Sequence, residues 1–63
     1  MAWVAVDHDG TEYIYHEKPR REELFMQFHG GIFVELPHGG IEKLIGRTLT
    51  WADEPVELRE VKQ

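Results

Sequence analysis

The amino-acid sequence predicts a small, mainly β domain: an antiparallel sheet or a small open barrel of four or five strands, with one short helix near residues 41–45. Two observations favour this class. Short runs of apolar, β-branched and aromatic residues alternate with turn segments rich in glycine, proline and aspartate. The chain also has only 63 residues, enough for one hydrophobic core, so we expect a single domain over residues 1–63.

Residues 2–6 and 11–16 are predicted to form a β-hairpin. A two-residue loop at Asp9-Gly10 would set Asp7 directly opposite Glu12, and like charges across a sheet are destabilising. We therefore favour a three-residue loop, in which Gly10 takes the left-handed conformation and forms a bulge.

The two faces of this predicted hairpin differ in character. The three-residue loop gives three cross-strand pairs: Trp3 with Tyr15, Ala5 with Tyr13, and Val4 with Ile14. Because side chains alternate along a strand, one face is aliphatic and suits a core, formed by Val4, Val6 and Ile14. The other face carries amphipathic rings that suit a boundary or a binding surface: Trp3, Tyr13 and Tyr15.

A second hairpin is predicted farther along the chain. Residues 17–23 read as a charged loop, because Pro19 lacks a backbone donor and ends the preceding strand. Residues 24–29 and 32–36 would then pair around Gly30-Gly31, which accepts the positive φ of a tight turn. The pairs would be Phe28 with Phe33 and Gln27 with Val34, and one side would form a second core face of Phe25, Ile32, Val34 and Leu36.

The last third of the chain predicts a short helix and a final strand. Ile41, Leu44 and Ile45 recur at helical spacing before Gly46, a natural stop. A helix this short is marginal alone, so we expect its apolar stripe to cover one end of the sheet. Residues 49–51 and 55–61 predict a last strand interrupted by a turn.

Composition narrows the class of protein. There is no cysteine, which excludes disulfides and thiolate metal sites and fits a reducing cytoplasm. The net charge of −5 disfavours general nucleic-acid binding and anionic membranes. No apolar run approaches the length of a membrane span. We expect a soluble, cytoplasmic protein.

No residue pattern indicates catalysis. The four histidines are separated by eight, thirteen and nine residues, so none forms the close pair typical of zinc sites. The chain has no serine, and its carboxylates have no evident cleft that would perturb them. We expect a protein that is not an enzyme, with no catalytic residue, no metal and no cofactor.

A binding surface is the more plausible kind of site. The aromatic face is followed by a basic stretch with Arg20 and Arg21, whose guanidinium groups suit phosphate or carboxylate. Trp51 is a second large aromatic residue of a type enriched at interfaces. The candidate binding surface comprises Trp3, Tyr13, Tyr15, Arg20, Arg21 and Trp51. A solvated charged loop and a half-buried Trp51 remain alternatives.

Four short motifs follow one another along the chain. They are Trp3-Val4-Ala5-x-Asp7-x-Asp9-Gly10, Lys18-Pro19-x-Arg21, Phe33-x-Glu35-Leu36-Pro37, and Leu49-Thr50-Trp51-x-Asp53-Glu54-Pro55-Val56-Glu57-Leu58. In these motifs the chain resembles a family of short, acidic, uncharacterised proteins of tailed phages and prophages. Residues 21–31 lie outside the resemblance. It implies an accessory phage protein in the host cell, with no catalytic residues to transfer.

Two functions are compatible with these observations. The first is a non-enzymatic, phage-type accessory protein that binds a host protein, in its most specific form a counter-defence inhibitor. The alternative is a protein that sequesters a nucleotide-like or signalling small molecule at an oligomer interface, using Arg20, Arg21 and the tyrosines. We also expect a homo-oligomer.

Overall fold

The computed structural model describes residues 1–59 and is mainly β with one short helix, which confirms the predicted class. Each element is a few residues long, as expected for a chain broken so often by turn residues. In chain order they are β1 (Trp3–Val6), β2 (Glu12–Tyr15), β3 (Arg20–Glu22), β4 (Gln27–His29), β5 (Phe33–Leu36), α1 (Gly40–Ile45) and β6 (Val56–Glu57).

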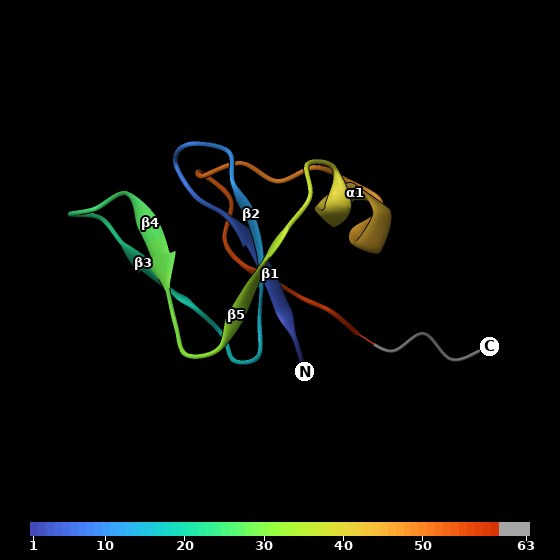
Figure 1. Ribbon diagram of the computed structural model, residues 1–63, viewed down its shortest axis with the longest axis horizontal. Helices are drawn as coiled ribbons and strands as arrows, with labels where there is room; N and C mark the ends of the chain where they lie inside the picture. The colour runs from blue at the N-terminus through green and yellow to red at the C-terminus, as the bar shows by residue number, and fades with distance from the viewer. Residues whose placement is uncertain (60–63) are drawn as a thin grey trace.

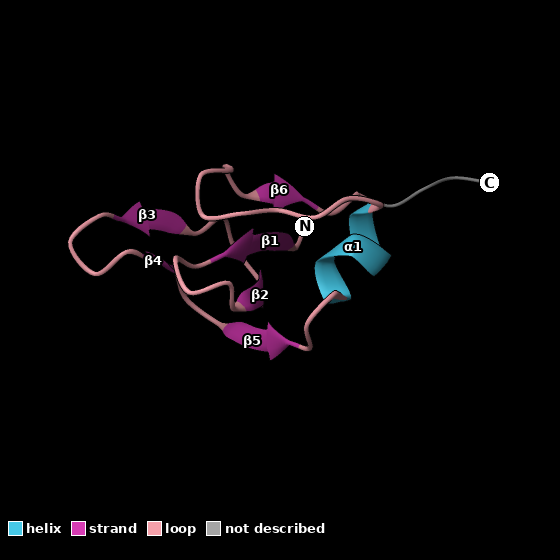
Figure 2. Cartoon of the chain, turned by 90° about the horizontal axis from the view of Figure 1, so that it is seen from above, coloured by secondary structure: helices cyan, strands magenta, loops and turns pink. Residues whose placement is uncertain are grey.

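The strands form two antiparallel sheets. The larger has the order β5-β2-β1-β6, and the smaller is the β3–β4 hairpin. Figures 1 and 2 show the larger sheet in the middle of the molecule, with α1 against one face and the β3–β4 hairpin against the other. Six described strands thus replace the predicted four or five.

The predicted register of the first hairpin is confirmed. Trp3 pairs with Tyr15 and Ala5 with Tyr13. Gly10 has φ 88°, its amide donates to the Asp7 carbonyl at 2.9 Å, and the Asp7 amide donates to the Thr11 carbonyl at 3.0 Å. This is the three-residue loop with a left-handed glycine, so the two faces of β1 and β2 are aliphatic and aromatic as expected.

The predicted pairing of the second hairpin is wrong. β4 pairs with β3, opposing Phe28 to Arg21, and β5 pairs with β2, opposing Phe33 to Tyr15. Residues 20–22, expected in a charged loop, are therefore a strand. The glycines serve a close approach instead of a tight turn, since a Cβ on Gly30 would lie 2.9 Å from the Pro19 Cα. Pairing of β5 with β2 extends the main sheet, while β4 pairs with β3 and places Phe28 on the aromatic face.

The predicted second core face does not form. Phe25, Ile32 and Val34 are exposed, and of the four expected residues only Leu36 packs against a core cluster. Phe25 lies in the turn of the β3–β4 hairpin, away from any strand, and β5 is an edge strand, so Ile32 and Val34 lie at the margin of the sheet.

The short helix is confirmed. α1 is capped at its end by Gly46, which has a left-handed φ of 82° and whose amide donates a hydrogen bond to the Glu42 carbonyl. Ile41 is 1% exposed and Ile45 packs beside it, whereas Leu44 is half exposed. The helix therefore covers the aliphatic face with part of the expected stripe.

The last strand is shorter than predicted. β6 has two residues, which pair with Trp3 and Val4 of β1, and residues 60 and 61 of the expected strand lie outside the described part of the chain. Before it, residues 46–55 run along one end of the sheet from the side of α1 to the side of the hairpin (Figure 1). A turn closed by the Asp53 amide on the Thr50 carbonyl, at 3.0 Å, reverses the chain.

A hydrophobic cluster packs on each face of the central strands. The aliphatic cluster consists of Val4, Val6, Ile41 and Leu49, with Ile14, Leu36, Ile45, Val56 and Leu58 around it. The aromatic cluster consists of Ala5, Tyr15 and Phe28, with Trp3, Tyr13 and Trp51 around it. The aromatic face is thus partly interior, because the β3–β4 hairpin packs on it.

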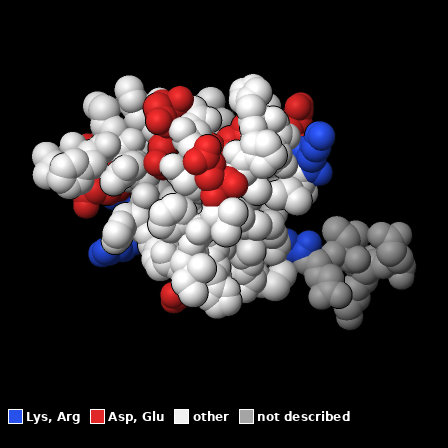
Figure 3. Space-filling model, in the orientation of Figure 1, with Lys and Arg blue, Asp and Glu red and all other residues white. Residues whose placement is uncertain are grey.

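Charge is unevenly distributed on the surface. On the face shown in Figure 3, acidic side chains gather over the upper half, from the β1–β2 turn towards α1, and the lower half over β5 is largely uncharged. Among residues 1–59, none of the helices has the length and apolar character needed to cross a membrane.

Candidate functional site

The predicted aromatic surface is only partly exposed. Tyr15 is 2% exposed and its hydroxyl donates to the Phe28 carbonyl at 3.3 Å. Trp3 and Tyr13 are half-buried, with Lys18 Nζ 5.3 Å from the Trp3 ring centroid. Burial, and then the nearby Asp7 carboxylate, raise the pKa of Tyr15 to about 12, so this phenol stays neutral and serves as a structural donor.

Arg21 and Trp51 form an internal cluster with Phe28. The Arg21 guanidinium carbon lies 4.8 Å from the centroid of Phe28 and 4.5 Å from that of Trp51. Its nitrogens donate to the carbonyls of Trp51 and Asp53 and to the Glu54 carboxylate. Arg21 therefore joins the hairpin to the segment before β6, which leaves few donors for an external phosphate.

Arg20 lies apart from that cluster. It is exposed on β3, and because side chains alternate along a strand it faces away from Arg21. The structure therefore does not gather the six predicted residues into one surface. Trp3, Tyr13, Tyr15, Arg21 and Trp51 belong to or border the aromatic core, and Arg20 stands on the outer side of the hairpin.

A small hollow remains on the aromatic face. Its volume is about 120 Å³, and its lining includes Tyr13, Phe28 and Phe33. Ligand pockets for drug-sized molecules are typically about 300–1,000 Å³. The hollow is therefore too small to enclose a nucleotide, and the predicted aromatic and basic ligand site has no matching cavity there.

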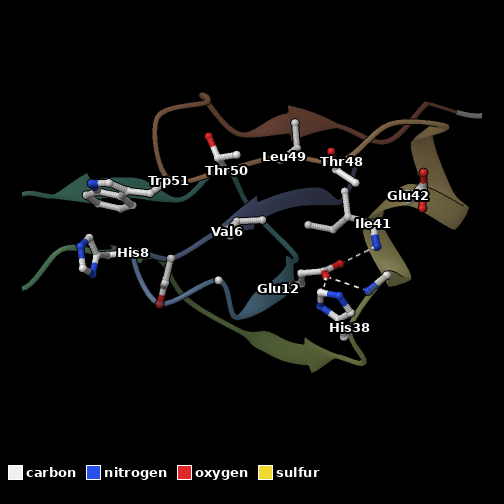
Figure 4. A pocket seen from close by; sticks show the side chains of 13 residues that line it. Val6, His8, Glu12, His38, Ile41, Glu42, Thr48, Leu49, Thr50 and Trp51 are labelled. Carbon is white, nitrogen blue, oxygen red and sulfur yellow. Dashed lines mark hydrogen bonds and ion pairs between the residues drawn. The ribbon is translucent and has the colours of Figure 1, made fainter.

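A larger pocket lies between α1, the β1–β2 turn and residues 48–51 (Figure 4). Its volume is about 300 Å³. Val6, Ile41 and Leu49 supply apolar lining, while Glu12 and His38 lie at one end and His8 and Trp51 at the other. Sequence reasoning missed this pocket, because residues 7–12 and 38–51 meet only through the sheet and the helix.

Glu12 is the central polar group of this pocket. It is 9% exposed, and its carboxylate accepts hydrogen bonds from the Gly39 amide at 2.7 Å and the Ile41 amide at 2.8 Å. Burial raises its pKa, but the two amide bonds and nearby His38 outweigh that effect and leave the pKa below its ordinary value. A carboxylate held ionised by two backbone amides in this way caps the start of α1 and is poorly suited to proton transfer.

The charges around the pocket also restrict a ligand. Asp7, Glu12 and Glu42 line it, and of the residues up to 59 neither a lysine nor an arginine does. Anionic phosphates would therefore meet carboxylates there. Within residues 1–59 no group of three or more histidine, aspartate or glutamate side chains is arranged to hold a metal ion.

The most exposed apolar group is the tip of the β3–β4 hairpin, formed by Leu24, Phe25 and Met26. These side chains are 79%, 68% and 51% exposed. Met26 has φ 54°, a left-handed conformation that L-residues with large side chains seldom adopt. Its carbonyl accepts the His8 amide at 3.2 Å, so the strained turn is held against the β1–β2 turn.

Sequence reasoning missed this tip because it assigned residues 24–29 to a strand. The available signal was the run Leu24-Phe25-Met26 between two glutamates and a glutamine, a run without the alternation of a half-buried strand. Carboxylates adjoin the tip in the structure. A hollow of about 210 Å³ beside Phe25 and Met26 is also lined by Asp7 and Asp9.

The fold and these sites define a small, two-sided β-sheet protein with a projecting apolar hairpin tip. No protein-family model matches the chain, and neither the curated proteins nor the solved structures contain a significant match.

Proposed function

We propose that this chain is a non-enzymatic, phage-type accessory protein that binds a host protein in the host cytoplasm, and that it inhibits a host component, most specifically a defence component. The observation that carries the binding proposal is the exposed tip of Leu24, Phe25 and Met26. The phage setting is supported by the resemblance of the flanking motifs described above.

The tip has the properties of an interface anchor. Burying the exposed parts of its three side chains would yield on the order of 3–6 kcal/mol before the costs of association. Met26 adds a flexible, polarisable side chain of the kind common at binding surfaces. A left-handed conformation at a large residue is a strain that concentrates at functional sites. All three residues therefore favour a partner that covers the tip.

The charge around the tip indicates the chemistry of the partner. Glu22 and Glu23 precede the tip, Asp9 lies beside it, and the whole chain carries a net charge of −5. An apolar cleft bordered by lysine or arginine would be complementary to this arrangement, with long-range attraction raising the association rate. The proposed host partner therefore offers such a basic-rimmed cleft.

The small-ligand alternative is better matched by the pocket beside Glu12 than by the aromatic face. The pocket beside Glu12 has the volume for a small ligand, and its acidic lining favours a neutral or cationic molecule over a nucleotide. Native mass spectrometry of the protein purified from host cells separates the two functions. A retained small molecule that is lost in Thr48→Trp, which fills the pocket from an exposed lining position, would support the alternative.

The partner proposal is tested with a matched pair of variants. Phe25→Ser removes the anchor from an exposed turn, and Leu44→Ser makes the same kind of change at the half-exposed position on α1. We expect one host protein to be captured by the native chain and by Leu44→Ser. The purified host protein should bind Phe25→Ser about 30-fold or more weakly than it binds the native chain, as for interface hot spots.

The same experiment can contradict the proposal. Equal affinity of the native chain and Phe25→Ser would exclude the tip as the anchor. Circular dichroism should show the same unfolding midpoint for both proteins, because Phe25 lies outside the core clusters.

A further inference from the structure

Among residues 1–59 no strand pairs with the outer edge of β5, and apolar side chains are exposed along this edge. β5 is the end strand of the sheet, and Ile32, Phe33 and Val34 are 74%, 54% and 61% exposed. Phe33 contacts the rings of Tyr13 and Tyr15, at centroid distances of 5.5 and 5.6 Å, and leaves its outer part free. Figure 2 shows β5 at the margin of the molecule, and Figure 3 shows a largely uncharged surface over it.

The two edges of the sheet are unequally protected against pairing. β6 at the opposite edge has two residues, follows Pro55, which lacks an amide donor, and carries Glu57 in an ion pair with Arg59 at 3.7 Å. Short length, proline and charge are devices that blunt an edge. β5 is twice as long, with four residues, and it carries only the single charge of Glu35, with Pro37 directly after it.

Hydrogen-bond alternation shows which backbone groups of β5 are free. The His16 amide donates to the Ile32 carbonyl at 3.0 Å, and Ile14 is paired with Val34. In an antiparallel ladder every second residue bonds to the same neighbour, so Ile32 and Val34 direct their backbone groups to β2. The amides and carbonyls of Phe33 and Glu35 therefore point outwards.

We infer that the β5 edge is a self-association site, at which a second copy of this chain pairs antiparallel about a two-fold axis at Val34. In this register Phe33 of each copy exchanges both backbone hydrogen bonds with Glu35 of the other. Val34 lies opposite its own counterpart as a close, non-hydrogen-bonded pair. All four outward groups of β5 are satisfied at once.

Neighbouring registers are less favourable. An axis at Glu35 would oppose two carboxylates directly, which is destabilising. An axis at Phe33 would require Gly31 to pair, but its φ of 33° is far from an extended strand. The edge is therefore complementary to itself in one register.

The size of the interface supports a second copy as the occupant. Covering the exposed side chains and backbone of both β5 strands would bury on the order of 1,000 Å², at the lower limit for a specific interface. The absence of positive charge on β5 makes an acidic peptide a poor alternative, and Glu35 alone gives little attraction for a basic one. The product is a continuous eight-stranded sheet built from two four-stranded ones.

Sedimentation of the full chain tests the inference. We expect a monomer–dimer equilibrium in the micromolar range of protein concentration. Val34→Lys should raise the dissociation constant by about tenfold or more, because it places two charges in contact on the axis. Leu44→Lys, the same change at an exposed site on α1, should leave it unchanged. A native chain that stays monomeric at all concentrations, or a dimer insensitive to Val34→Lys, would overturn the inference.

Cross-linking tests the register without depending on stability. The chain has no cysteine, so Val34→Cys introduces a single thiol at the axis, where non-hydrogen-bonded pairs bring Cβ atoms close enough for a disulfide. We expect mild oxidation to give a covalent dimer with Val34→Cys and little with Glu35→Cys. The opposite preference would contradict the axis at Val34. Partner binding through Phe25 is measured separately, so failure of the dimer leaves that proposal standing.

Discussion

Met26 adopts a backbone conformation that lowers the stability of the fold, at the centre of the proposed binding tip. Its φ of 54° costs about 1 kcal/mol or more for a residue with a side chain. We expect Met26→Gly to raise the free energy of unfolding by about 1 kcal/mol, less the extra freedom of glycine in the unfolded chain, while weakening partner binding. Met26→Ala keeps the strained backbone and should give no such gain. Urea denaturation of both variants provides the measurement, and equal stabilities would show that the turn is not strained.

Glu12 makes the stability of the fold depend on pH. Its pKa is below the ordinary value in the folded protein, so it stabilises the fold above the unfolded-state value and loses that contribution as the pH falls through the folded-state pKa. At pH 7 we expect Glu12→Gln to lower the free energy of unfolding by about 2 kcal/mol, since it weakens the two hydrogen bonds that backbone amides donate to a charged carboxylate.

The pH dependence of this difference provides the check. The difference in stability between the native chain and Glu12→Gln should stay nearly constant from pH 7 to about the ordinary pKa of 4.5, and should shrink as the pH falls below that value. Glu42→Gln, which changes an exposed carboxylate on the same pocket rim, is the matched control, and at pH 7 it should change the free energy of unfolding by less than about 0.5 kcal/mol. A constant gap for Glu12→Gln would mean that its charge is not what supports α1.

At the scale of elements, Arg21 fixes the hairpin to the rest of the molecule. Its guanidinium stacks between Phe28 and Trp51 and donates to the Trp51 and Asp53 carbonyls. Arg21→Lys keeps the charge but loses the planar fork, so we expect a loss of about 2 kcal/mol in the free energy of unfolding. Arg20→Lys, on the exposed side of the same strand, should change it by less than about 0.5 kcal/mol. Similar values for both would contradict the bridging role.

The accuracy of the sequence-based predictions also differs between elements. The β1–β2 hairpin and α1 were predictable because turn chemistry at Gly10 and Gly46 and the charge clash at Asp7 act over a few residues. The pairing of β4 and β5 was not, because it depends on which distant strand offers a free edge. Gly30-Gly31 has the composition of a tight turn, yet its role is steric, against Pro19.

At the scale of the whole molecule, the candidate sites were the hardest part to predict. The sequence placed Arg21 and Trp51 on a binding surface, whereas the structure joins Arg21 to Trp51 and to Glu54 within the molecule. These partners lie 30 to 33 residues from Arg21 in the chain, a contact that local patterns do not encode. The exposure of Phe25 and Phe33 follows from the hairpin projecting and from β5 ending the sheet. Both are properties of the complete topology.

The proposed binding tip and the proposed dimer edge lie in different parts of the molecule. The apolar tip lies at the end of the β3–β4 hairpin, while the free edge lies on the main sheet (Figures 1 and 2). A dimer formed through β5 would carry two tips, so a partner with two matching clefts would be bound with greater avidity than either contact alone provides. The apparent affinity for such a partner should be higher for the native chain than for Val34→Lys.

The contact between Pro19 and Gly30 has an evolutionary consequence. It brings together the two ends of the β3–β4 hairpin, which is inserted between β2 and β5, strands that are already neighbours in the sheet. Changes in the length or sequence of the hairpin tip therefore need not shift the register of the sheet. The tip can therefore vary in sequence while Arg21, Phe28 and the main sheet are kept, and for engineering it offers a position for grafted recognition loops.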